Sequence, residues 1–375
     1  MTSALFSPLQ VRALQLKNRI VISPMMQHAA PGGFATPWHL VHLGKFALGG
    51  AGLIFTESTA VSPMGRIGRD DAGLWRDEHV QPWKDVVDFV HQQGAAIGVQ
   101  LGHAGRKAGS QPLWLGGDAL TLEQMAQDDP NWVRWGPSAI AAGEGWSTPK
   151  AMTHADIAQA VDEFAAAARR AQLAGFDVIE LHFGHGYLVT SFLSPISNQR
   201  NDAYGGDLQG RMKLAMDIAT RVRQEWPSDK PLWCRLSVVD GAVGGWSESD
   251  TVQLVRQLQT VGVDVIDCSS GGLTEQTKAL PVPRGLGFQV PLARLVRAQT
   301  GVLTQAVGMI VDPHQAQEII ATGAADLVAI GRQALFDPYW PLHAQWALQR
   351  DASFQDWPLR HGVWLQKRQT FLDTL

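Results

Sequence analysis

The chain has 375 residues, of which 45% are hydrophobic and 18% are charged, and its formal net charge is −4. This size and composition allow one large barrel domain with an ample core, and the charge provides no basic footprint for nucleic acid. Residues 1–7 lack the features of a signal peptide, and no run of about 18 apolar residues could cross a bilayer, so a soluble, cytoplasmic protein is expected.

Eight short, apolar and β-branched runs alternate with segments of helical periodicity. The clearest helix spans 153–174, where Thr153 can cap the start and Gly175 can end it. This alternation predicts a single-domain (β/α)8 TIM barrel over residues 1–375, with an open doubly wound sheet as the alternative. No G-x-G-x-x-G motif follows any run, which disfavours the open sheet. The predicted strands are 20–23, 53–56, 96–101, 178–181, 232–236, 265–268, 303–306 and 327–330, and the other predicted helices are about 78–93, 208–224, 247–262, 290–300 and 312–323.

Three further segments flank this pattern. Residues 6–16 predict a hairpin that plugs the lower end of the barrel. Residues 102–152, rich in Gly, Pro and Trp, form a long connection after the third strand, and connections of this length usually carry function. A tail of about 345–375 follows the last barrel helix. Cys234 and Cys268 lie within predicted strands, so buried thiols in a reducing compartment are expected rather than a disulfide.

Polar rings follow the fourth predicted strand, in the segment HFGHGYL at 182–188. Because the carboxyl ends of the strands build the active site of a TIM barrel, His182, His185 and Tyr187 are expected to share one space. With His103 the two histidines could hold a metal ion; alternatively they bind an anionic or carbonyl oxygen, or pack in the core. Oxygen binding is favoured, because no carboxylate or cysteine occupies a matching strand end and arginines at two other strand ends would bring positive charge.

Two more features of the strand ends suggest chemistry. A phenol with an ordinary pKa of about 10 can protonate a developing carbanion, so Tyr187 is a candidate proton donor, with core packing as the alternative. Gly308 and Gly331 follow the seventh and eighth strands, where glycines let main-chain N–H groups approach an anion, and Arg332 adds positive charge. These three residues predict a phosphate site, although both glycines could be simple turns.

Taken together, these motifs resemble the Old Yellow Enzyme family of flavin-dependent ene-reductases, most of all its bacterial, thermophilic-like class and the xenobiotic reductases. The likeness spans roughly residues 4–345. Each motif alone is weak, but their shared order along the chain is highly specific. The matching motifs are LKNRI at 16–20, WHLVHLG at 38–44, QLGHAGRK at 100–107, HFGHGYL at 182–188, LSP at 193–195, N-x-R-x-D-x-Y-G-G at 198–206, SSGG at 269–272 and IGR at 330–332.

This resemblance implies an enzyme that binds FMN and takes electrons from NADPH or NADH. In the implied ping-pong reaction the flavin then reduces a small activated alkene that carries a carbonyl or nitro group. His182 and His185 would bind the substrate oxygen, and Tyr187 would protonate the α-carbon. Arg235 would face the N1–O2 side of the flavin. The other implied flavin contacts are Pro24, Met25, Met26, Ser58 and Gln100 at the ring and Gly308, Gly331 and Arg332 at the phosphate.

The loop after the first strand departs from this class, which usually has a cysteine near the flavin and a tyrosine two residues later. Met26 and His28 occupy these positions; a thioether cannot donate as a thiol does, and an imidazole can titrate near neutrality. His28 and Trp364 of the tail are also candidate substrate contacts, Trp364 in its own subunit or a neighbouring one of a homodimer or higher homo-oligomer. The alternatives are a redox-neutral isomerase or an oxidative flavoenzyme with the same site, and a metal-dependent barrel hydrolase.

Overall fold

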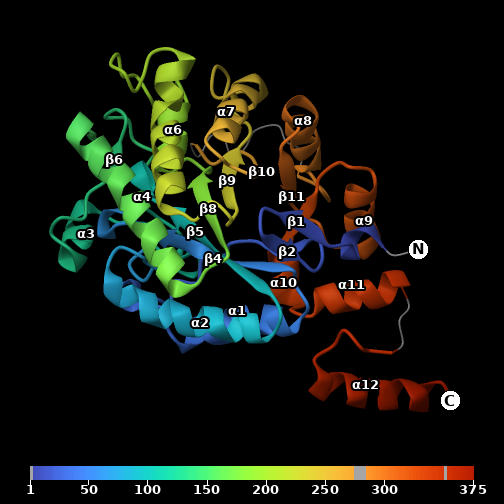
Figure 1. Ribbon diagram of the computed structural model, residues 1–375. Helices are drawn as coiled ribbons and strands as arrows, with labels where there is room; N and C mark the ends of the chain where they lie inside the picture. Colours follow the sequence, from blue (N-terminus) through green and yellow to red (C-terminus); the bar gives the residue numbers. More distant parts are fainter. Residues whose placement is uncertain (1–2, 274–283, 350–352) are drawn as a thin grey trace.

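The eight predicted strands form a closed parallel barrel surrounded by helices (Figure 1). The computed structural model describes residues 3–273, 284–349 and 353–375. Ile330 of the last strand pairs with Ile22 of the first, which closes the ring and confirms the predicted barrel. In order around the barrel the strands are β3 (Ile20–Ile22), β4 (Leu53–Ala60), β5 (Ala96–Gly102), β8 (Val178–Phe183), β9 (Leu232–Ser237), β10 (Val265–Ser269), β11 (Leu303–Val307) and β12 (Leu327–Ile330).

All six predicted helices are present, and α4 (His154–Ala174) shows why they form where expected. Thr153 Oγ1 accepts a hydrogen bond from the Asp156 N–H at 3.2 Å, and Gly175 ends the helix with a φ of 91°. The structure adds α1 (Pro37–Leu48), which the sequence interpretation did not assign as a helix. The remaining helices are α2 (Val80–Gln92), α3 (Leu122–Asp128), α5 (Leu188–Leu193), α6 (Leu208–Glu225), α7 (Glu248–Thr260), α8 (Val290–Thr300), α9 (Pro313–Ala321), α10 (Arg332–Phe336), α11 (Trp340–Gln349) and α12 (Leu359–Leu372), and the short strands are β1 (Leu9–Val11), β2 (Leu14–Leu16), β6 (Trp135–Gly136) and β7 (Lys150–Ala151).

Two hydrophobic clusters divide the strand residues into those facing the helices and those facing the barrel interior. Ile179 and Leu181 of β8 pack in the large cluster that includes the surrounding helices, whereas Val178 belongs to a separate inner cluster. Val11 and Leu16 of the antiparallel pair β1–β2 are in this inner cluster, so the hairpin lies against the amino-terminal ends of the strands. The other buried members of the inner cluster are Val21, Leu53, Phe55, Trp233, Val265, Leu327 and Ala329.

One buried arginine holds together the long connection after β5. Arg134 is 1% exposed and donates hydrogen bonds to the main-chain oxygens of Ala108, Gly109 and Leu120 at 2.8, 3.0 and 2.7 Å. The guanidinium thereby satisfies three carbonyl groups that the loop would otherwise bury without partners. The predicted long connection therefore has internal structure, with α3, β6 and β7 inside it.

The tail packs at the end of the barrel where the hairpin lies. Trp357 stacks on Tyr339 with ring centroids 5.5 Å apart. A cavity between the tail and the barrel is lined by Trp357 and by Lys17 and Gly50, which precede β3 and β4. The tail thus lies on the side of the residues that precede these two strands, and α12 is its last helix (Figure 1). Within the described ranges, no helix is both long and apolar enough to cross a membrane.

Replacing Arg134 with methionine should loosen the long connection while the barrel stays folded. Methionine has a similar length but no donors, so three buried carbonyl groups lose their partner at a cost of about 2–4 kcal/mol of local stability. We expect limited proteolysis within 108–150 to become faster by on the order of tenfold or more, with an unchanged far-UV circular dichroism spectrum. Arg368→Met, at an exposed position of α12, is the matched control, and equal cleavage rates in the two variants would contradict the role of Arg134.

Candidate active site

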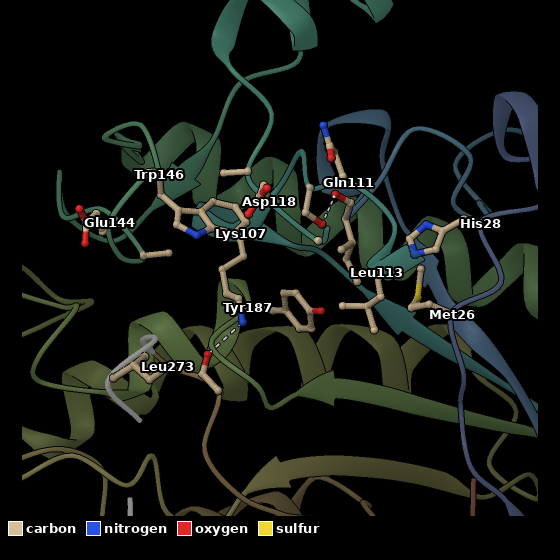
Figure 2. A pocket seen from close by; sticks show the side chains of 17 residues that line it. Met26, His28, Lys107, Gln111, Leu113, Asp118, Glu144, Trp146, Tyr187 and Leu273 are labelled. Atoms are coloured by element: carbon tan, nitrogen blue, oxygen red, sulfur yellow. Dashed lines mark hydrogen bonds between the residues drawn. The ribbon is translucent and has the colours of Figure 1, made fainter. Parts of the chain in front are cut away.

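A cavity of about 500 Å³ lies among loops that follow the carboxyl ends of the barrel strands (Figure 2). Met26 and His28 enter it from the loop after β3, Lys107 from the turn after β5 and Tyr187 from the loop after β8. Tyr187 lies between Lys107 and Met26, and its hydroxyl points toward the side of Met26 and His28 (Figure 2). The volume suits a small organic molecule. Met26 and His28 from the first loop and Tyr187 from the loop after β8, predicted from two separate segments, therefore share one cavity.

A tight turn after β8 positions Tyr187. His185 has a φ of 62° and Gly186 a φ of 78°, and a Cβ at Gly186 would lie 2.2 Å from the main-chain oxygen of Gly272. Only glycine fits this close approach between the loops after β8 and β10. Lys107 Nζ joins the same two loops, because it donates to the main-chain oxygens of His185 and Gly272 at 2.9 and 3.0 Å.

The two predicted histidines lie side by side next to the tyrosine. His185 Nδ1 is 3.4 Å from His182 Nε2, and the ring centroids of His182 and Tyr187 are 5.1 Å apart. His185 Nε2 lies 2.7 Å from Ser269 Oγ, so this hydroxyl occupies one nitrogen of the ring. His182 Nδ1 is buried without a hydrogen-bond partner among the described residues. Neither histidine is among the cavity-lining residues, and their contact with a substrate stays a prediction.

Burial and nearby positive charge set the protonation states of these rings. Burial, helped by the charge of Arg235, lowers the pKa of His182 and of His185 well below the ordinary value. Burial raises the pKa of Tyr187, and the carboxylate of Asp71 adds to this increase. At neutral pH the site therefore presents two neutral imidazoles, each with one N–H donor, and a protonated phenol.

Arg235 places a buried cation inside the barrel. The residue is 9% exposed, its Nε lies 3.1 Å from Asp267 Oδ2, and its Nη1 donates to Ser23 Oγ at 3.4 Å. The Nε has no well-aligned hydrogen bond among the described residues, so the guanidinium is incompletely satisfied. A buried, partly unsatisfied guanidinium fits a cofactor that carries negative charge, as FMN does.

Gln100 is held by a buried carboxyl group that the sequence interpretation missed. Gln100 is 2% exposed, pairs in register with Ser58 across β4 and β5, and donates through Nε2 to Glu180 Oε1 at 2.7 Å. Burial, followed by the charge of Asp267, raises the pKa of Glu180 to about 8. A sequence signal could have found Glu180 and Asp267, because each is a carboxylic acid inside an apolar run. Glu180 comes two residues before His182 and Asp267 two residues before Ser269, so each acid lies on the same face of its strand as that strand-end residue.

The predicted phosphate residues line a second cavity of about 240 Å³. Gly308 has a φ of 120°, and a Cβ there would lie 2.9 Å from the ring of Phe288. A Cβ at Gly331 would lie 3.6 Å from Met25 Sδ, so the first loop packs against the end of β12. Glycine main chain beside the cationic side chain of Arg332 is a suitable environment for a phosphate group. The structure therefore brings together Gly308, Gly331 and Arg332, with Met25 beside Gly331, whereas the contact of Pro24 with a flavin stays a prediction.

Two residues considered in the sequence lie apart from the cavity. Trp364 is 68% exposed on α12 and does not line the cavity, so its contact with a substrate stays a prediction that requires a partner subunit. His103 Nδ1 accepts a hydrogen bond from the Gly105 N–H at 3.0 Å, and burial lowers the pKa of His103 to about 4. In the part of the chain that the structure describes, no group of three or more His, Cys, Asp and Glu side chains could hold a metal ion.

Comparisons with known proteins agree with this geometry. The family model described as "NADH:flavin oxidoreductase / NADH oxidase family" matches residues 4–351. The NADPH dehydrogenase of Geobacillus thermodenitrificans is 42% identical over 347 residues, which cover 92% of this chain and 94% of that protein. The NADPH dehydrogenase of Bacillus subtilis is 41% identical over 343 residues, which cover 91% and 94%. The solved structure of morphinone reductase has a TM-score of 0.77 at 25% identity and covers 92% of this chain and 90% of that one. The chain therefore belongs to the NADH:flavin oxidoreductase / NADH oxidase family, is of the Old Yellow Enzyme type, and is an FMN-dependent NAD(P)H oxidoreductase.

Proposed function

We propose that this chain reduces the C=C bond of α,β-unsaturated carbonyl or nitro compounds, with NADPH or NADH as the electron source. The observation that carries the proposal is the neutral His182–His185 pair beside Tyr187, near a buried Arg235. The names of the related NADPH dehydrogenases and of morphinone reductase support a reductive direction. When bound, FMN would supply hydride transfer between the nicotinamide and the β-carbon of the alkene.

The barrel interior and the first loop would hold FMN. Arg235 would place its charge beside the part of the ring that becomes negative, and the Gln100 amide would face the same edge, fixed from behind by Glu180. The contact of Met25 with the end of β12 supports placing the ring and the phosphate at adjoining strand ends. The remaining residues assigned to FMN are Pro24, Met25, Met26 and Ser58 at the ring and Gly308, Gly331 and Arg332 at the phosphate.

The two histidines would bind the carbonyl or nitro oxygen of the substrate. Neutral imidazole N–H groups draw electron density from this oxygen and so make the β-carbon more electron-poor. The lowered pKa of both rings means that they act as hydrogen-bond donors and not as acids across the physiological range. The Ser269 hydroxyl at 2.7 Å from His185 Nε2 would help to fix the tautomer and orientation of that ring.

Tyr187 would protonate the α-carbon. Its raised pKa keeps the phenol protonated well above neutral pH, so the proton is available throughout the working range. The ammonium group of Lys107 lies 5.1 Å from the centroid of the Tyr187 ring and would stabilise the phenolate that remains after the transfer. Lys107 is itself held by its two main-chain acceptors, so this charge is fixed in place.

Tyr187→Phe should separate the two half-reactions. Loss of the proton donor should slow reoxidation of the reduced protein by an activated alkene by about 10²-fold, while anaerobic reduction by NADPH changes little. Stopped-flow absorbance of the flavin measures both rates. Tyr339→Phe, in the stack with Trp357, is the matched control and should leave both rates unchanged. An equal loss in both half-reactions would show that Tyr187 is not the proton donor.

Arg332→Ala should weaken FMN binding through the phosphate group. Removing one charge-assisted contact should raise the dissociation constant of FMN by about 10- to 100-fold, measured by quenching of flavin fluorescence on binding to the apoprotein. Riboflavin, which lacks the phosphate, should bind the variant and the unaltered protein equally. Arg294→Ala, at an exposed position of α8, is the control. A variant that loses riboflavin affinity to the same degree as FMN affinity would contradict the phosphate assignment.

A further inference from the structure

His28 occupies an unusual backbone position in the wall of the cavity. Its φ is 49°, a left-handed conformation that residues other than glycine rarely adopt. Such conformations persist where surrounding contacts enforce them, and they cluster at functional sites. The ring lies on the same side of Tyr187 as Met26, the side toward which the phenol oxygen points (Figure 2). The backbone conformation of His28 is therefore energetically unfavourable, and the surrounding contacts must hold the imidazole in place.

A buried carboxylate fixes the His28 ring. His28 Nδ1 lies 2.9 Å from Asp71 Oδ1, a close ion pair without a well-aligned hydrogen bond among the described residues, and Asp71 is 1% exposed. The other oxygen, Asp71 Oδ2, accepts hydrogen bonds from the N–H groups of Ile67 and Gly68 at 2.6 and 2.9 Å. A Cβ at Gly68 would lie 2.9 Å from His28 Nδ1, so glycine is needed for this approach. Because Nδ1 faces Asp71, Nε2–H is the second donor that a protonated ring can offer to a ligand.

The charges around His28 favour its protonated form. Burial alone would lower the pKa of His28, but the adjacent carboxylate of Asp71, together with Glu57 and Asp70, raises this pKa above its ordinary value. Glu57 is itself paired with His39 at 3.0 Å, and the edge of Trp114 covers the ring at a centroid distance of 5.6 Å. The site thus has two kinds of histidine: the His182–His185 pair, whose pKa values are lowered, and His28 in the cavity wall, whose pKa is raised.

We propose that His28 and Asp71 form a specificity subsite for a carboxylate, at the side of the cavity where the phenol oxygen of Tyr187 points. This inference rests on the proposed function, and it narrows the substrate class to alkenes that carry an anionic carboxylate in addition to the activating carbonyl. The imidazolium donates Nε2–H to the carboxylate, and Asp71 keeps the ring charged and oriented. The acidic residues Asp118 and Glu144 also line the cavity, but both are exposed and therefore screened by solvent.

Two phenols that differ by one charge test the subsite in the FMN-loaded protein. 4-Hydroxybenzoate carries a carboxylate and 4-hydroxybenzamide a neutral group of the same shape, and phenols stacked on flavin give a long-wavelength absorbance band that reports binding. We expect the preference for the benzoate to fall by about tenfold between pH values of about 5.5 and 8.5. The preference for the benzoate should fall with rising pH because it requires the imidazolium. It is complete below the raised pKa of His28 and is lost as the ring deprotonates.

Two variants make the test specific. Asp71→Asn can retain both main-chain hydrogen bonds through its amide oxygen while losing the charge, so the fall in preference should move to lower pH. His28→Tyr offers a neutral phenol, so the preference should no longer vary with pH. Asp85→Asn, an exposed carboxylate on α2, should retain the unaltered profile. The subsite alone is overturned if the preference for the benzoate does not vary with pH in the unaltered protein, or if it still varies with pH in His28→Tyr. The proposed function is overturned as well if the protein binds FMN but gives no absorbance band with either phenol.

Discussion

The burial of Arg235 is the constraint on which the rest of the site depends. A guanidinium that is 9% exposed requires a close opposite charge, and Asp267 supplies it at a distance of 3.1 Å. The same positive charge contributes to the low pKa of His182 and His185 and opposes the rise in the pKa of Glu180. One cation on β9 thus influences the pKa values of His182, His185 and Glu180, and the two histidines are the proposed ligands of the substrate oxygen.

The barrel interior changes from apolar to polar along its axis, and this change determines where a ligand can bind. Residues at the amino-terminal ends of the strands form an apolar cluster with the hairpin, whereas positions nearer the carboxyl ends of the strands carry buried polar groups. Because the pKa of Glu180 is about 8, this carboxylic acid is protonated at neutral pH and leaves the Arg235–Asp267 pair balanced. A buried carboxylate at Glu180 would instead oppose an anionic cofactor at the site proposed beside Gln100.

Periodicity sufficed to predict the barrel, because each strand is a short apolar run and each helix of the predicted set repeats its apolar residues at helical spacing. Strand-end residues could also be predicted, since the fold places chemistry at that end. Asp71 could not be predicted, because its pairing with His28 joins two loops and leaves no local pattern. The contact of His185 with Ser269 likewise depends on how the loops after β8 and β10 pack. Trp364 lies exposed on α12, and the periodicity of the sequence does not indicate where this tail helix packs.

The visible spectrum of the purified protein, followed through one anaerobic cycle, tests the central claim most directly. We expect a yellow protein with one non-covalent FMN per chain that bleaches when NADPH is added. Addition of an α,β-unsaturated ketone should then restore the colour, with one saturated product formed per flavin. A protein that takes up no flavin even when FMN is supplied would contradict the family assignment in this chain. A protein that bleaches but is reoxidised by no activated alkene would retain the flavin site and contradict the proposed reaction.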